Sequence, residues 1–142
     1  MKVVLDSNIY IAAFSSRGLC SSLFELCLDS TTILISEHII SEVLKNLLKK
    51  IKLPADKAND IIIYLREQCI VKGYKKLSDK ICRDADDDNI LALARDNQAD
   101  YIITGDKDLL ALKKFDLIPI IDPRKFWSII KKKEGNSKNT MN

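Results

Sequence analysis

Four aspartates occupy five consecutive positions in the segment "DADDD", from Asp84 to Asp88, directly before an apolar helical pattern. Like charges at this spacing repel one another, and no basic residue separates them. One aspartate in the first turn of a helix interacts favourably with the helix dipole, by about 0.3–1 kcal/mol, so capping accounts for a single member of the group. Asp84 and Asp86 can be solvated surface residues. For Asp88, at the start of the helix, a divalent cation is the better explanation, because coordination turns repulsion into binding.

A calcium loop is an alternative, because Asp84, Asp86 and Asp88 match the D-x-D-x-D spacing of an EF-hand. That loop also needs glycine at its sixth position and a bidentate glutamate at its twelfth. Those positions hold Asn89 and Arg95 in this chain. The EF-hand interpretation is therefore excluded.

Three further acids lie where chemistry is expected. Asp6 and Asp106 each follow a short apolar run that predicts a strand. Ligands of open α/β sheets bind beyond the carboxyl ends of the strands, so acids at two strand ends are typical of a metal site, with helix N-capping as the alternative for each. Glu42 lies about 60° outside the apolar arc of a predicted helix, at roughly 100° per residue. It can point along the end of the sheet or into solvent.

Other catalytic groups are scarce in the chain. His38 is the only histidine, one helical turn before Glu42, and we interpret it as a surface or capping residue. There is no Ser–His pairing for a nucleophilic triad, and the glycines are too isolated for a phosphate-binding loop. The four cysteines form no CxxC pair, which predicts reduced thiols in the core.

The elements that must position these acids alternate along the chain. Short apolar runs predict strands at 2–5, 31–36, 70–74, 100–105 and 117–121. Helical spacing predicts helices at 8–14, 19–29, 37–51, 53–69, 89–98, 107–115 and 122–130. Ser36 is the predicted N-cap of the helix over 37–51. This alternation predicts an α/β fold with a parallel sheet and helices on both faces.

Composition limits the class of protein. Of the 142 residues, 46% are hydrophobic and 30% charged, as in a single globular domain. No apolar run approaches the roughly 18 residues that span a bilayer, and the N-terminus has no signal-peptide pattern, so a cytoplasmic protein without membrane contact is expected. The net charge of +3 comes from the end of the chain, "KKKEGNSKNTMN". We expect residues 1–130 to form the domain and residues 131–142 a basic, disordered tail.

The order of the motifs adds a family resemblance. "LDSN", "SEHIISEVL", "DADDDNILALA" and "YIITGDKDLL" follow one another within a span from Lys2 to Ile130 that resembles the PIN-domain family, and specifically its prokaryotic members described as toxins of toxin–antitoxin pairs. The resemblance implies a three-layer α/β/α sandwich around a central, mostly parallel sheet.

On this resemblance, the catalytic acids correspond to Asp6, Glu42, Asp88 and Asp106. The residues expected to support them are Ser7, Asn8, Thr104, Asp87 and Asp108. Ser7 stands where threonine is commoner, and Ala85 stands where proline is frequent. The motif favours Asp88 and Asp106 as ligands over their acidic neighbours Asp87 and Asp108.

The family implies a metal-dependent ribonuclease that leaves 5′-phosphate and 3′-hydroxyl ends. Carboxylates suit Mg²⁺ or Mn²⁺ and leave coordination positions for water and phosphate. Asp6, Asp88 and Asp106 would be ligands, directly or through water, and Glu42 would hold a metal-bound water. The implied partners are an RNA substrate, an antitoxin protein and a second copy of the chain in a homodimer. Lysines around the rim could contact RNA phosphates.

Other functions fit the sequence less well. An aspartyl-phosphate phosphatase needs Asp-x-Asp after the first strand, and a phospho-receiver needs paired acids there, but the chain has Asp6-Ser7-Asn8. The remaining alternative is a PIN-like module that binds RNA or a protein without cleaving it. Metal-dependent cleavage would distinguish the two.

Overall fold

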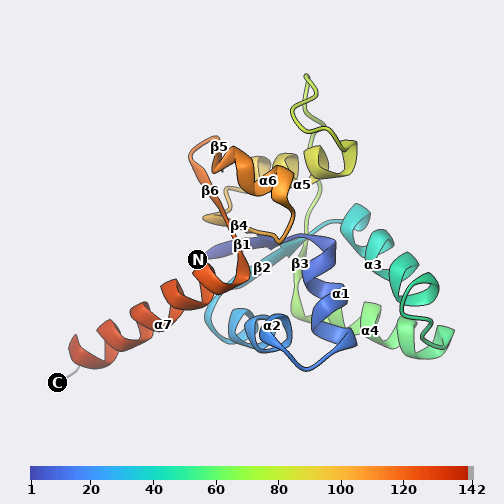
Figure 1. Cartoon of the computed structure of the whole chain (residues 1–142), viewed down its shortest axis with the longest axis horizontal. Helices are drawn as coiled ribbons and strands as arrows, with labels where there is room; N and C mark the ends of the chain where they lie inside the picture. The colour runs from blue at the N-terminus through green and yellow to red at the C-terminus, as the bar shows by residue number, and fades with distance from the viewer. Residues whose placement is uncertain (141–142) are drawn as a thin grey trace.

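A six-stranded sheet runs through the middle of the computed structural model, which describes the backbone of residues 1–140 and the side chains of residues 1–135 (Figure 1). The strands lie in the order β3-β2-β1-β4-β6-β5. Their bounds are β1 Lys2–Leu5, β2 Thr32–Ile35, β3 Ile70–Val71, β4 Tyr101–Ile103, β5 Lys114–Phe115 and β6 Ile118–Ile121. Every neighbouring pair is parallel except β5 and β6, which are antiparallel.

Helices cover both faces of this sheet. Their bounds are α1 Ser7–Ser15, α2 Leu19–Ser30, α3 Glu37–Lys49, α4 Ala55–Gln68, α5 Ala85–Asp96, α6 Lys107–Leu112 and α7 Pro123–Thr140. Figure 1 shows α5 and α6 on one side of the sheet and α1 to α4 on the other, where α7 packs against α2. The predicted three-layer α/β/α arrangement with a mostly parallel sheet is confirmed.

The central strands are buried on both sides, as a sheet between two helical layers requires. Val3, Val4 and Leu5 of β1 are inaccessible to solvent, as are Ile102 and Ile103 of β4. Parallel strands covered on both faces read as continuous β-branched runs rather than alternating patterns, which is why these segments were recognisable from sequence. The central strands therefore form a rigid base for the residues that follow them.

One predicted element is wrong in its extent. The helix expected over 107–115 ends at Leu112, and residues 114–115 form β5. Lys113 has a φ of 64°, which ends the helix, and the two residues between β5 and β6, Asp116 and Leu117, have φ values of 47° and 66°. Two consecutive residues with positive φ form the type I′ turn that matches the twist of a two-stranded hairpin. No glycine or asparagine marks this turn in the sequence.

Two helix boundaries also differ from expectation. α5 begins at Ala85 rather than near residue 89, so three aspartates lie in its first turn. α7 continues to Thr140, through most of the segment expected to be a disordered tail from residue 131. The prediction for residues 141–142 lies outside the described residues.

Among residues 1–140, no single helix is long and apolar enough to cross a membrane. The pair α1 and α2, which meet at 110°, passes the test of length and composition only when the two are taken together.

Candidate metal centre

The order of the strands creates a crevice at the ends of β1 and β4. From β1 the chain goes to β2 on one side, whereas β4 pairs with β1 on the other side, with Leu5 opposite Ile103. Asp6 and Asp106 follow these two adjacent strands. A sheet whose connections diverge at neighbouring strands leaves a ligand-binding crevice there. The two acids therefore meet at the expected point.

Asp6 is a buried acid with two structural partners. Its carboxylate accepts a hydrogen bond from the backbone N–H of Ile9 at 3.2 Å, which makes it the N-cap of α1. It also accepts a short hydrogen bond from the hydroxyl of Thr104. Only 4% of Asp6 is exposed, and this burial raises its pKa above the ordinary value, while the hydrogen bond from Thr104 opposes the increase. Metal coordination would compensate for burying this charge.

Thr104 connects the two strand-end acids, Asp6 and Asp106, through its hydroxyl group. Its hydroxyl donates to Asp6 and accepts a hydrogen bond from the backbone N–H of Asp106 at 3.0 Å. Asp106 in turn caps α6, because its carboxylate accepts from the N–H groups of Asp108 and Leu109 at 2.8 and 3.0 Å. Thr104 is completely buried. Both the capping and the metal interpretations of Asp6 and Asp106 are thus compatible with one geometry.

Glu42 reaches the same crevice from α3. Ser36 caps this helix as predicted, accepting from the N–H of Ile39 at 3.1 Å. Partial burial is the main reason that the pKa of Glu42 is raised, and the negative charge of Asp86 adds to the increase. The side chain therefore points toward the acidic pocket and not into open solvent.

A pocket of about 200 Å³ brings the acids together. It is lined by Asp6, Ser7, Asn8, Glu42, Asn46, Lys50, Asp84, Asp86, Asp87, Ile90 and Asp106. One lysine faces many carboxylates in this lining, so the local charge is strongly negative. Oxygen donors at this density match the ligand preference of Mg²⁺ and Mn²⁺. The residues present therefore fit a hard divalent cation.

The structure places Asp87, and not Asp88, in this pocket. Burial raises the pKa of Asp87 to about 7, and the charges of Asp106, Asp84 and Asp6 add to the increase. The carboxylate is therefore close enough to the other pocket acids to share their electrostatic environment. The preference of the motif for Asp88 over Asp87 is not supported by this geometry.

Asp88 instead holds the backbone of the preceding loop. Its two oxygens accept hydrogen bonds from the N–H groups of Ile81 at 3.2 Å and Cys82 at 2.7 Å. It lines a separate hollow beside Lys76 and Lys80. The side chain of Asp88 is therefore directed at the loop, whereas that of Asp87 lines the pocket.

The loop over residues 72–84 is also attached to the C-terminal end of α5, through the first residues of the loop. The N–H of Lys75 donates to the carboxylate of Asp96 at 2.6 Å, and the carbonyl of Lys75 accepts from Arg95 at 2.8 Å. Asn97 donates to the carbonyl of Gly73 at 3.0 Å. The loop, which extends away from the sheet between β3 and α5 in Figure 1, is therefore fixed by both ends of the same helix.

The remaining predicted residues have distinct places. Ser7 and Asn8 line the pocket, whereas Asp108 contributes its backbone N–H to the cap at Asp106. Lys50, one of the lysines expected around the rim, also lines the pocket, and sequence reasoning missed Asn46. They follow Glu42 at steps of four residues, which places all three on one face of α3. That spacing was the available signal.

A pH dependence follows from the acidic pocket without metal. The folded-state pKa of Asp87 is raised to about 7 from an ordinary value of 3.8, and the pKa values of Asp6 and Glu42 are raised as well. A raised folded-state pKa means that the folded protein binds protons more tightly, so stability is highest at low pH and is lost as pH rises toward 7. We expect the urea midpoint in EDTA to fall from pH 5 to pH 8. The fall should be smaller in Asp87→Asn, and a midpoint that rises over this range would contradict the assignment.

The fold and the site together define an α/β domain with an acidic pocket at the point where the strand connections diverge. A family model described as "PIN domain" matches residues 2–108. The chain belongs to the PIN domain family. The uncharacterised protein MJ1680 of Methanocaldococcus jannaschii is 30% identical over 118 residues, which cover 80% of this chain and 76% of the relative.

Two solved structures are similar in fold. VapBC2 from Rickettsia felis, solved bound to a DNA fragment from its promoter, superposes with a TM-score of 0.62 at 15% identity, covering 86% of this chain and 98% of the other. VapC20 from Mycobacterium tuberculosis, described as a Sarcin-Ricin loop cleaving toxin, gives a TM-score of 0.59 at 14% identity, covering 82% and 99%. At these identities the similarity establishes the fold.

Proposed function

We propose that this protein is a divalent-metal-dependent ribonuclease that hydrolyses phosphodiester bonds of RNA. The observation that supports it is the convergence of Asp6, Glu42, Asp87 and Asp106 on one pocket, from four separate elements of the fold. Membership of the PIN domain family points in the same direction.

Each residue of the pocket has a separate role in the proposed reaction. Asp6, Asp87 and Asp106 would hold one or two Mg²⁺ or Mn²⁺ ions, with Asp87 in the role that the sequence motif assigned to Asp88. Such ions, when bound, activate a water for in-line attack and stabilise charge on the scissile phosphate. Glu42 orients the attacking water. Thr104 fixes the two strand-end acids relative to each other through its hydroxyl.

The substrate must approach an acidic pocket, so cationic residues at its rim are needed. Lys50 lines the pocket itself, and Lys45 and Lys49 lie on the same helix. We propose that these lysines contact RNA phosphates on either side of the bond that is cut.

We propose further that the protein is the cytoplasmic toxin of a toxin–antitoxin pair, working as a homodimer and restrained by a small antitoxin. The fold similarity to VapBC2 and VapC20 supports this role. Co-expression with the product of a neighbouring reading frame, followed by co-purification, would test for the antitoxin.

The direct test is cleavage of a labelled single-stranded RNA pool with Mg²⁺ or Mn²⁺. We expect cutting that EDTA stops and that Asp6→Asn abolishes. Asp60→Asn, a change of the same kind on an exposed position of α4, should cut like the wild type. Cutting that persists in Asp6→Asn would reject the site. RNA binding without cutting under either metal would favour a binding module that has lost catalysis.

A further inference from the structure

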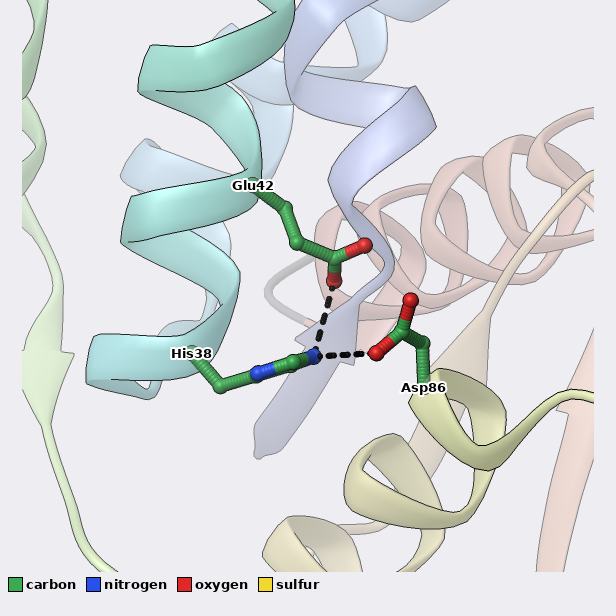
Figure 2. A group of neighbouring side chains, drawn as sticks. All are labelled: His38, Glu42 and Asp86. Carbon is green, nitrogen blue, oxygen red and sulfur yellow. Dashed lines mark ion pairs between the residues drawn. The ribbon is translucent and has the colours of Figure 1, made fainter.

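The only histidine of the chain lies between two carboxylates at the edge of the acidic pocket (Figure 2). His38 and Glu42 are one turn apart on α3, and Asp86 comes from the first turn of α5. The Nε2 atom of His38 is 3.3 Å from Oε1 of Glu42 and 3.0 Å from Oδ1 of Asp86. One donor atom from each residue lies within 4.8 Å of the other two. Two helices from opposite layers therefore contribute to one cluster.

The imidazole does not satisfy this contact by hydrogen bonding. Within the described residues, Nε2 of His38 is shielded from solvent and has no hydrogen-bond partner of acceptable geometry. An N–H at this nitrogen would thus point at neither carboxylate. Buried polar atoms without a partner are rare and call for an explanation such as an ion.

The two distances from Nε2 of His38 match those between metal ligands. In a tetrahedral zinc site with bonds of about 2.0–2.1 Å, neighbouring ligand atoms lie roughly 3.3 Å apart. The two contacts of Nε2, at 3.3 and 3.0 Å, are close to this value. The side chains of Glu42 and Asp86 are 24% and 50% exposed, so an ion can approach from the side of these two carboxylates and keep a water as its fourth ligand.

The donor set differs from that of the neighbouring acids. Asp6, Asp87 and Asp106 offer oxygen alone, which suits Mg²⁺ and Mn²⁺. An imidazole nitrogen beside two carboxylates suits later first-row ions, among them Zn²⁺. We propose that His38, Glu42 and Asp86 form a second cation site, selective for Zn²⁺ and similar ions.

This site shares Glu42 with the proposed active centre. An ion held by His38 and Asp86 draws the carboxylate of Glu42 away from the attacking water. Zn²⁺ is then an inhibitor of cleavage, an effect that rests on the proposed nuclease function. The binding site itself does not depend on that function.

Binding can be measured without RNA. In protein labelled with ¹⁵N-histidine, the single imidazole gives one Nε2 and one Nδ1 resonance, and cysteine thiols that bind Zn²⁺ elsewhere contribute nothing. Stepwise addition of ZnSO₄ at pH 8 should shift the Nε2 resonance to a saturable end point. Asp86→Asn should weaken binding by at least about tenfold. Asp106→Asn, which removes a carboxylate of the other group and keeps an oxygen for the cap of α6, should titrate like the wild type.

The outcomes separate the two proposals. If the Nε2 resonance does not shift on addition of Zn²⁺, or shifts equally in Asp86→Asn, the proposed cation site is rejected. The three residues then form a simple ion pair. Inhibition of Mg²⁺-dependent cleavage should need at least about tenfold more Zn²⁺ in His38→Gln than in the wild type. Equal inhibition of the two proteins overturns the effect on Glu42. If the chain does not cut RNA, the imidazole titration still decides whether the site exists.

Discussion

Replacing Asp87 by asparagine should reduce metal-dependent RNA cleavage by at least about a thousandfold. Loss of one charged ligand removes several kcal/mol of transition-state stabilisation, and each 1.36 kcal/mol is about tenfold in rate. The carboxylate faces the pocket, and the charges of Asp106, Asp84 and Asp6 act on it. Asp88→Asn is the matched comparison, because it makes the same chemical change one residue along the helix. This variant should keep most of its cleavage activity.

The two variants should move stability in opposite directions. At pH 8, Asp87→Asn removes a charge that its neighbours disfavour, so metal-free stability should increase. Asp88→Asn leaves one good acceptor for two backbone N–H groups, at a cost of about 1–2 kcal/mol. Thermal unfolding in EDTA measures both effects. If Asp88→Asn abolished cleavage at unchanged stability, the sequence motif would be right and our assignment wrong.

Replacing Thr104 by valine should destabilise the protein by about 2–4 kcal/mol. Valine has nearly the same shape but no hydroxyl, so the buried carboxylate of Asp6 loses a donor and the N–H of Asp106 loses an acceptor. Leaving buried polar groups unpaired costs more than the bonds themselves contribute. Urea unfolding at pH 8 in EDTA gives the change.

Thr104→Ser is the control for this result, since it keeps the hydroxyl and removes only a methyl group. The serine variant should keep most of the stability that the valine variant loses. It should also bind the metal more tightly than the valine variant does. Equal midpoints for the valine and serine variants would mean that the methyl group, not the hydrogen-bonded bridge, is what Thr104 contributes.

Much of the fold follows from local patterns in the sequence. Parallel strands buried on both faces produce continuous apolar runs, and Ser36 produces a recognisable helix start. The turn at Asp116 and Leu117 has no such signal, because its residues adopt positive φ under the constraint of the hairpin. α6 was therefore expected to be longer than it is.

The position of the pocket was predictable from the sequence, but which aspartate of α5 lines it was not. Asp6 and Asp106 could be placed because each follows a strand, and the pairing of these two strands became visible only in the structure. Asp87 and Asp88 are chemically identical and adjacent, so their types and spacing cannot tell them apart. What separates them is the direction of each side chain on α5, which depends on where the helix begins. The helix begins at Ala85, four residues before the apolar pattern from which the helix was predicted.

The double attachment of the loop over residues 72–84 has a consequence for how such a protein can vary. The tethers at Gly73, Lys75, Ile81 and Cys82 leave the stretch between 76 and 80 with its ends held close to one helix. Closing a longer loop between fixed ends costs only about 0.6 kcal/mol for each doubling of its length. Insertions and new side chains can accumulate there without displacing Asp87. The chain thus carries, beside the acidic pocket, a segment whose length and side chains can change without altering that pocket.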